Sequence, residues 1–138
     1  MKMSPVLAKR ASFHSEVIPI IEKARDESDW FMAIVFSAIQ LERYGYFILK
    51  KHLESMEVQY EQKVLEFLPL SSIALFLVAL GKITSPEYQT IIAVNHARND
   101  FMHRRDVKQF AHGEQAKNQY TPLVNRTIKI LTKKLGTW

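Results

Sequence analysis

The sequence predicts an all-α protein, an up-and-down bundle of about five helices that forms a single domain over residues 1–138. Three observations predict this fold. Apolar residues recur at helical spacing along almost the whole chain. No segment alternates apolar and polar residues as a half-buried strand does. Four glycines and five prolines are few for a chain of tightly turning strands.

Two helices are predicted in the N-terminal part of the chain. The first is short, from about Ser15 to about Glu27, with Pro19 near its first turn, where a missing amide proton is tolerated. The second is long, from Trp30 to about His52, and Asp29 can accept a hydrogen bond from its free N-terminal amides. The predicted buried stripe of this long helix comprises Phe31, Ile34, Val35, Ala38, Leu41, Gly45 and Ile48.

Two more helices are predicted on either side of Pro69. The first lies near Val58 to Leu68. Its expected buried residues are Tyr60, Val64 and Phe67 or Leu68. The second occupies the most apolar stretch, FLPLSSIALFLVAL (residues 67–80), and ends at Gly81, a residue suited to a left-handed cap. Because this stretch is shorter than the about 20 residues that span a bilayer, we expect a buried core helix and no membrane anchor.

Two helix-start signals occur in the C-terminal half of the chain. Residues 85–87 combine a capping residue, Ser85, with a proline at the first helical position and an acidic residue at the positive end of the helix dipole. Thr121 and Pro122 repeat the signal for a last helix, and the polar residues 104–119 before it are predicted to be loop. The last helix is expected to direct Val124, Ile128, Leu131 and Leu135 inward and Arg126, Lys129 and Lys133 outward.

Cysteine is absent from the chain, which excludes disulfides, zinc–thiolate sites and thiol nucleophiles. The N-terminal residues also lack the long apolar core of a signal peptide. Both features are typical of a cytoplasmic protein without membrane attachment, and this is the expected location.

Positive charge is concentrated near the C-terminus. Residues 1–97 contain ten Lys or Arg and eleven Asp or Glu, whereas residues 98–138 contain nine Lys or Arg and three Asp or Glu. This excess suggests a polyanionic partner such as nucleic acid, because each phosphate contact releases counterions and adds affinity. The alternative is that these cations only solvate helix surfaces.

The segment HARNDFMHRR (residues 96–105) is the densest in groups that transfer protons or bind phosphate. A metal site is one hypothesis, because His96, Asp100 and His103 share a helix face and the Asp–His spacing matches that of di-iron bundles. Such bundles need a second pair of this kind, and no other histidine follows an acidic residue by three positions. We therefore expect neither a metal nor a cofactor.

Arg98 and His103 support a second hypothesis, metal-free cleavage of RNA. An imidazole can remove the proton of the ribose 2′-hydroxyl, and the oxygen then attacks the adjacent phosphorus. A guanidinium can hold the phosphorane oxygens as negative charge develops on them. The product would carry a 2′,3′-cyclic phosphate. DNA lacks the nucleophile and would not be cleaved.

The segment LGKITSPEYQTIIAVNHARNDFMH (residues 80–103) resembles the final-helix signature of the HEPN superfamily, whose domains are α-helical bundles. In that signature an arginine, usually followed by a polar residue such as asparagine, is separated from a histidine by four to six residues. Arg98, Asn99 and His103 match it. The long early helix, the apolar middle helix and the short link before the segment add to the resemblance, which implies that these three residues form the catalytic site.

The resemblance also implies a function. Many HEPN proteins are metal-independent ribonucleases, often toxins, that use this arginine and histidine in a cleft at a homodimer interface. We therefore expect an RNA-cleaving homodimer, a toxin or defence component held in check by an antitoxin, for which a nucleotidyltransferase is the candidate. The alternative is a non-catalytic module that binds RNA or a nucleotidyltransferase, as other HEPN proteins do. A purely structural bundle is the remaining alternative.

Three cations follow the signature and are expected to bind the RNA backbone; they are Arg104, Arg105 and Lys108. Alternatively, they only favour the negative end of a helix dipole.

The spacing of Arg98 and His103 raises a geometric requirement. On an uninterrupted helix the two residues lie about 140° apart around the axis. They can meet at one phosphate only if Arg98 reaches round, the helix bends or a partner subunit supplies one of them. Glu42, on the long helix, is a candidate ion-pair partner for Arg98 across the bundle, with Asp100 and Glu87 as alternatives nearer to it in the sequence.

Overall fold

The computed structural model describes residues 5–103 and 113–135. Within these two ranges the chain forms six helices and no strand. The helices are α1 (Pro5–Asp26), α2 (Trp30–Ser55), α3 (Gln62–Glu66), α4 (Leu70–Ala79), α5 (Ser85–His103) and α7 (Gly113–Leu135). The predicted all-α helical bundle is therefore confirmed.

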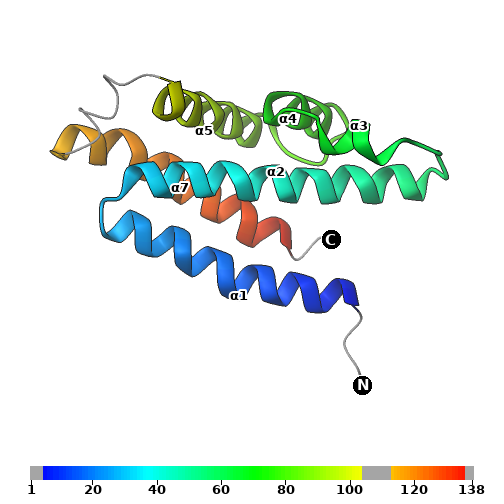
Figure 1. Cartoon of the computed structure of the whole chain (residues 1–138), viewed down its shortest axis with the longest axis horizontal. Coiled ribbons are helices and arrows are strands. Elements are labelled where there is room, and N and C mark those ends of the chain that lie inside the picture. The colour runs from blue at the N-terminus through cyan, green and yellow to red at the C-terminus, as the bar shows by residue number, and fades with distance from the viewer. Residues whose placement is uncertain (1–4, 104–112, 136–138) are drawn as a thin grey trace.

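Helix α2 lies at the centre of the bundle. It contacts α1, α4, α5 and α7. Figure 1 shows α4 and α5 along one side of α2, α1 along the opposite side and α7 crossing behind it. Because helices surround it, α2 buries residues along most of its length, from Trp30 at its first position to Leu49 near its end.

The predicted buried stripe of α2 is largely confirmed. Its fully buried members are Ile34, Ala38, Leu41 and Gly45, and its partly buried members are Val35 and Ile48. Phe31 departs from the prediction, because 37% of its surface is exposed. Its ring nevertheless meets Phe101 of α5 edge-on, with 5.8 Å between ring centroids.

Hydrogen bonds confirm two predicted helix ends. Asp29 precedes α2, and its side chain accepts the N–H of Met32 at 3.1 Å. At the end of α4, Gly81 adopts a left-handed φ of 70°. The N–H of Lys82 then donates to the carbonyl of Leu77 at 2.8 Å, the long bond of a Schellman motif.

Helix α1 begins well before the predicted start. It runs from Pro5, so Pro19 lies inside the helix and not in its first turn. Pro19 is exposed, whereas Ile18 and Ile21 beside it are buried. Burial of these two residues holds the helix together across the proline, which removes one backbone hydrogen bond.

Helix α7 also begins earlier than predicted. Thr121 and Pro122, predicted to start the last helix, lie inside it, and residues 113–119, predicted to be loop, are helical. The reason is tertiary packing around Tyr120, which is 5% exposed. Its ring centroid lies 6.2 Å from that of Trp30 on α2, so the segment before the proline is held in the core.

The apolar middle of the chain is less buried than predicted. Helix α3 is short and buries Leu65. Of the residues predicted to be buried, Tyr60 and Leu68 are partly buried against the core, whereas Val64 and Phe67 are 62% and 82% exposed. Helix α4 is not a fully buried core helix, because α2 and α5 cover only one side of it. The exposed large apolar residues of this segment are Leu75 and Phe76 within α4 and Leu80 at its C-terminal cap. None of the described helices is both long enough and apolar enough to cross a membrane.

Helices α2 and α4 approach closely at Gly45. A Cβ atom built at this position would overlap the Cγ2 methyl of Ile73 on α4. Gly45 is therefore required for the distance between the two helices.

Gly45→Ala is expected to lower the free energy of unfolding by about 1–2 kcal/mol. This value already includes the gain of about 1 kcal/mol that alanine brings over glycine inside a helix. The added methyl group overpacks the contact with Ile73. Urea denaturation measures the loss. In the double variant Gly45→Ala/Ile73→Ala the loss should be smaller than the sum of the two single losses, and strictly additive losses would contradict the proposed overlap.

Candidate functional site

A capping box fixes the start of α5, the helix that carries the predicted site. The N–H of Glu87 donates to Thr84 Oγ1 at 3.2 Å, and the Glu87 carboxylate accepts the N–H of Thr84 at 2.8 Å. Ser85 was predicted to be the cap but is the first helical residue. The Thr-x-x-Glu spacing is the sequence signal that identifies Thr84 instead.

The inner face of α5 packs against α2 and α7. Its buried apolar residues are Ile91, Val94, Ala97 and Phe101. Phe101 is fully buried, and its ring centroid lies 5.2 Å from that of Tyr120 on α7. Phe101 therefore anchors the end of α5, where the predicted catalytic residues lie.

Arg98 forms an ion pair with Glu42 of α2, as the sequence suggested. Its Nη1 donates to the Glu42 carboxylate and its Nη2 donates to Asn95 Oδ1 at 2.7 Å. Only 21% of the Arg98 side chain is exposed. Asn95, which is 8% exposed, was not among the predicted residues, and its position one turn before Arg98 is the signal that could have identified it.

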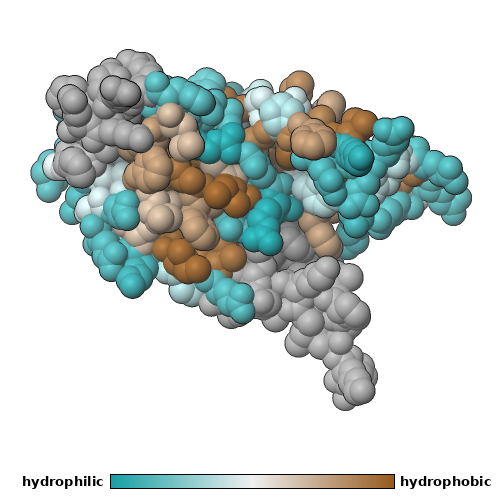
Figure 2. Space-filling view, viewed as in Figure 1, coloured by the Kyte–Doolittle hydropathy of each residue, from teal (hydrophilic) through white to brown (hydrophobic). Residues whose placement is uncertain are grey.

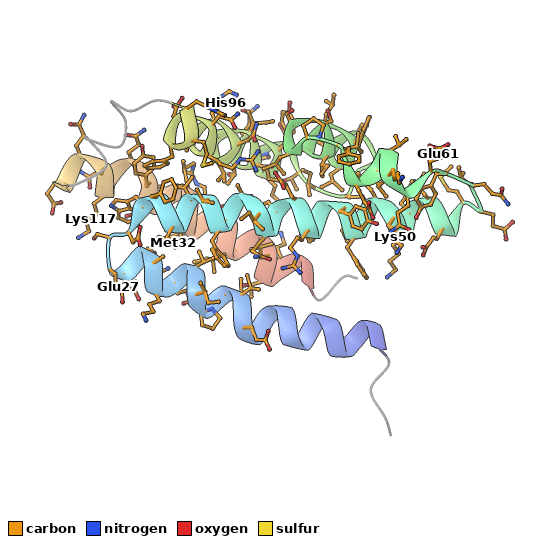
Figure 3. The ribbon with its side chains drawn as sticks, in the orientation of Figure 1. Glu27, Met32, Lys50, Glu61, His96 and Lys117 are labelled. Carbon is orange, nitrogen blue, oxygen red and sulfur yellow. The ribbon has the colours of Figure 1, made fainter. Side chains whose placement is uncertain are left out.

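The outer face of α5 carries the other predicted residues. Asn99 and His103 lie one turn apart and are both exposed. His96 shares this face and points away from α2 (Figure 3). The structure thus places Asn99 and His103 on one face, while the guanidinium of Arg98 is held against α2. Helix α5 is continuous over Ser85–His103, so the expected separation of about 140° between Arg98 and His103 applies.

Two further predictions concern a metal site and three cations that would bind the RNA backbone. The residues of the metal hypothesis were His96, Asp100 and His103. Within residues 16–103 and 113–133, whose side chains the structure describes, no three His, Cys, Asp or Glu side chains are grouped so that they could hold a metal ion. The predicted backbone-binding cations Arg104, Arg105 and Lys108 lie outside the described residues.

Comparisons with protein-family models, curated proteins and solved structures found no match. The chemistry of the site is therefore inferred from its own residues.

Two tyrosines beside α5 have raised pKa values. Burial, and secondly the Glu87 carboxylate, raises the pKa of Tyr44 on α2 far above its usual value of 10.0. Burial, and secondly the charge of Asp100, raises the pKa of Tyr120 on α7. In both cases the phenolate is disfavoured because it would lose hydration and face a carboxylate.

Glu42→Ala is expected to lower the free energy of unfolding by about 1–2 kcal/mol, because it leaves a largely buried guanidinium without its counter-charge. The loss stays below that of a fully buried pair, since 36% of the Glu42 side chain is exposed and water screens the interaction. Glu27→Ala is the control, because it removes only the exposed pair with Lys23 and should cost less than about 0.5 kcal/mol. Equal losses in urea denaturation would contradict a special role for the Arg98–Glu42 pair.

Stability is expected to fall as the pH rises above about 10, in part because of Tyr44. The folded state keeps this phenol protonated while the unfolded chain releases the proton near pH 10.0, so its contribution is complete below that pH and is lost above it. One such group changes the free energy of unfolding by up to about 1.4 kcal/mol per pH unit. Urea denaturation between pH 9 and pH 11.5 should show a shallower decline for Tyr44→Phe than for the wild type. Parallel declines would refute the contribution.

Proposed function

We propose that the chain is a metal-independent endoribonuclease of the HEPN type, with Arg98 as the phosphate-binding residue and His103 as the general base. The observation that carries the proposal is the preorganised guanidinium of Arg98. Its bonds to Glu42 and Asn95 use one N–H of each terminal nitrogen. The Nε–H and the second N–H of each terminal nitrogen make no hydrogen bond to the described residues, and they can donate to phosphate oxygens.

The proposed reaction needs no cofactor. The imidazole of His103 takes the proton from a ribose 2′-hydroxyl, and the 2′-oxygen attacks the adjacent phosphorus. Arg98 stabilises the charge on the phosphorane oxygens. The bond from phosphorus to the 5′-oxygen then breaks, and that oxygen takes up a proton from water while the imidazolium of His103 returns its proton to the solvent. The products are a 2′,3′-cyclic phosphate and a 5′-hydroxyl end. Asn99, one turn before His103 on the same face, is placed to orient the imidazole or the phosphate.

The geometry of α5 supports a homodimer as the active form. The helix is continuous, and both terminal nitrogens of Arg98 are held by Glu42 and Asn95, so neither a bend nor a reorientation of Arg98 joins it to His103. A partner subunit that presents its own histidine opposite Arg98 would complete the site.

Exposed apolar side chains near the end of α5 also support the dimer. Phe31 of α2, whose ring meets Phe101, and Met102 of α5 are 37% and 55% exposed. Figure 2 shows apolar residues gathered over the N-terminal half of α2 and the adjoining part of α1. An interface between two copies of this chain would remove such surface from water.

A second candidate function is binding without cleavage, with RNA or a nucleotidyltransferase as the partner. Glu42 favours this candidate, because its carboxylate already neutralises Arg98 within one subunit. In a toxin–antitoxin pair the nucleotidyltransferase would be the antitoxin, and its gene would adjoin that of this chain.

Cleavage of total cellular RNA in EDTA tests the proposal. The wild type should cut RNA and leave 2′,3′-cyclic phosphate ends, detected by mass spectrometry, and should leave DNA intact. His103→Ala should reduce the rate at least about 100-fold, because a general base contributes that much or more. His103 is exposed, so this variant should remain folded. His52→Ala, a histidine at the far end of α2, is the matched control and should retain full activity.

Three outcomes decide between the candidates. Cleavage by the wild type and by His52→Ala but not by His103→Ala supports the ribonuclease. Equal cleavage by all three proteins indicates a contaminating nuclease and contradicts the proposed site. No cleavage by any of them overturns the proposal in favour of binding. Light scattering on the same samples should give the mass of a dimer, and a monomer that cleaves RNA would overturn the shared site.

A further inference from the structure

A cleft of about 850 Å³ lies between the start of α5 and the C-terminal half of α7. Three cations of α7 line it, namely Arg126, Lys129 and Lys133. They occupy positions i, i+3 and i+7 and so share one face of the helix over about two turns. Across from them, the lining comes from Thr84, Ser85 and the first turns of α5.

These three cations form no ion pair with the described residues and outnumber the acidic residues of the cleft. Arg126, Lys129 and Lys133 take part in none of the ion pairs formed among the described residues. Glu87 is the one acidic residue in the described lining, so three cations face one carboxylate and the cleft keeps an excess of positive charge. An anionic ligand would therefore supply the missing negative charge.

A second hollow on the other side of α7 shares two of the same cations. It measures about 540 Å³ and is lined by Lys129 and Lys133 together with Arg25 of α1. Arg25 is already engaged, by Asn125 at 2.9 Å and by Asp26 at 3.0 Å. Its charge is thus partly neutralised. Two hollows that share cations across one helix suit an extended anion laid over α7 better than a small molecule enclosed on one side.

The chemistry of the lining favours a phosphodiester backbone. Proteins bind phosphate oxygens through Arg, Lys, Ser and Thr side chains and through helix N-termini, and the first cleft contains all of these. No aromatic side chain lines either hollow among the described residues, so nothing there is placed to stack on bases.

We infer that the ridge of α7 formed by Arg126, Lys129 and Lys133 binds the sugar–phosphate backbone of a single-stranded nucleic acid without reading its bases. That the natural polymer is RNA rests on the proposed ribonuclease function. The contact between α7 and a sugar–phosphate backbone is inferred independently of that function. This surface is separate from Arg98 and His103, and it would hold a long strand while another part of that strand is cut.

The test measures binding of a fluorescent single-stranded DNA of mixed sequence and of the RNA of the same sequence, by anisotropy, at several salt concentrations. DNA cannot be cut by a mechanism that needs a 2′-hydroxyl, so it reports binding alone. Binding of RNA is measured in the His103→Ala background, so that cleavage does not interfere. The variant Arg126→Gln/Lys129→Gln/Lys133→Gln is compared with Lys50→Gln/Lys51→Gln/Lys63→Gln. The control removes the same charge from the far end of α2 (Lys50 in Figure 3) and from α3.

Loss of the three α7 cations should weaken binding of both polymers about tenfold or more near 0.1 M salt. It should also reduce the slope of log affinity against log salt by about 2, since each contact to a single strand contributes about 0.7. The control variant should lose much less. All variants should first show wild-type helix content by circular dichroism, which is expected because the substituted side chains lie at the surface.

Two results would overturn the inference. The first is an equal loss of nucleic-acid affinity in the two triple variants, which would show that the total charge of the protein, and not the α7 surface, determines binding. The second is equal competition by polyglutamate and DNA at matched charge, which would point to an acidic protein partner. Neither result depends on cleavage. A protein that binds DNA through α7 but never cleaves RNA would refute the ribonuclease and leave this inference standing.

Discussion

The burial of α2 is the constraint on which the rest of the structure depends. Four helices pack on it, so its sequence has to present apolar or small residues to nearly every side. Gly45 allows the approach of α4, and Ile34, Ala38 and Leu41 of the same helix are fully buried in the core. The same packing limits the access of water to one edge of α2, so a charged residue there gains from a partner. Glu42 lies at that edge, and Arg98 is its partner.

Local sequence signals predicted the parts of the fold that local chemistry decides. Asp29 and Gly81 act within one turn of the chain, and both behave as predicted. The start of α7 could not be predicted in this way. Pro122 reads as a helix start, but the packing of Tyr120 on distant rings keeps the preceding residues helical. The exposure of Phe67 likewise depends on which helices cover it, and no property of its own segment encodes that.

The sequence predicted which residues belong to the candidate site but not how their side chains are arranged. Arg98 was identified from its spacing to His103, and Glu42 was suggested as its partner from the opposite helix. The role of Asn95 and the orientation of the guanidinium toward α2 emerge only when α5 is packed on the bundle. Similarly, periodicity predicted that the cations of α7 face outward. The cleft beside them exists because residues some forty positions earlier begin α5 there.

Pro122 lies between two halves of α7 that make different contacts. The half before Pro122 is held by Tyr120 against α2 and α5, and the half after it carries the cations. Pro122 cannot donate the backbone hydrogen bond that would tie it to the preceding turn, so the joint between the halves is softer than the helix on either side. The two halves are joined through the core instead, because Val124, Thr127 and Leu131 after the proline are fully buried. The charged face of α7 is therefore held in place by packing on the opposite face of the same helix and not by the backbone at Pro122.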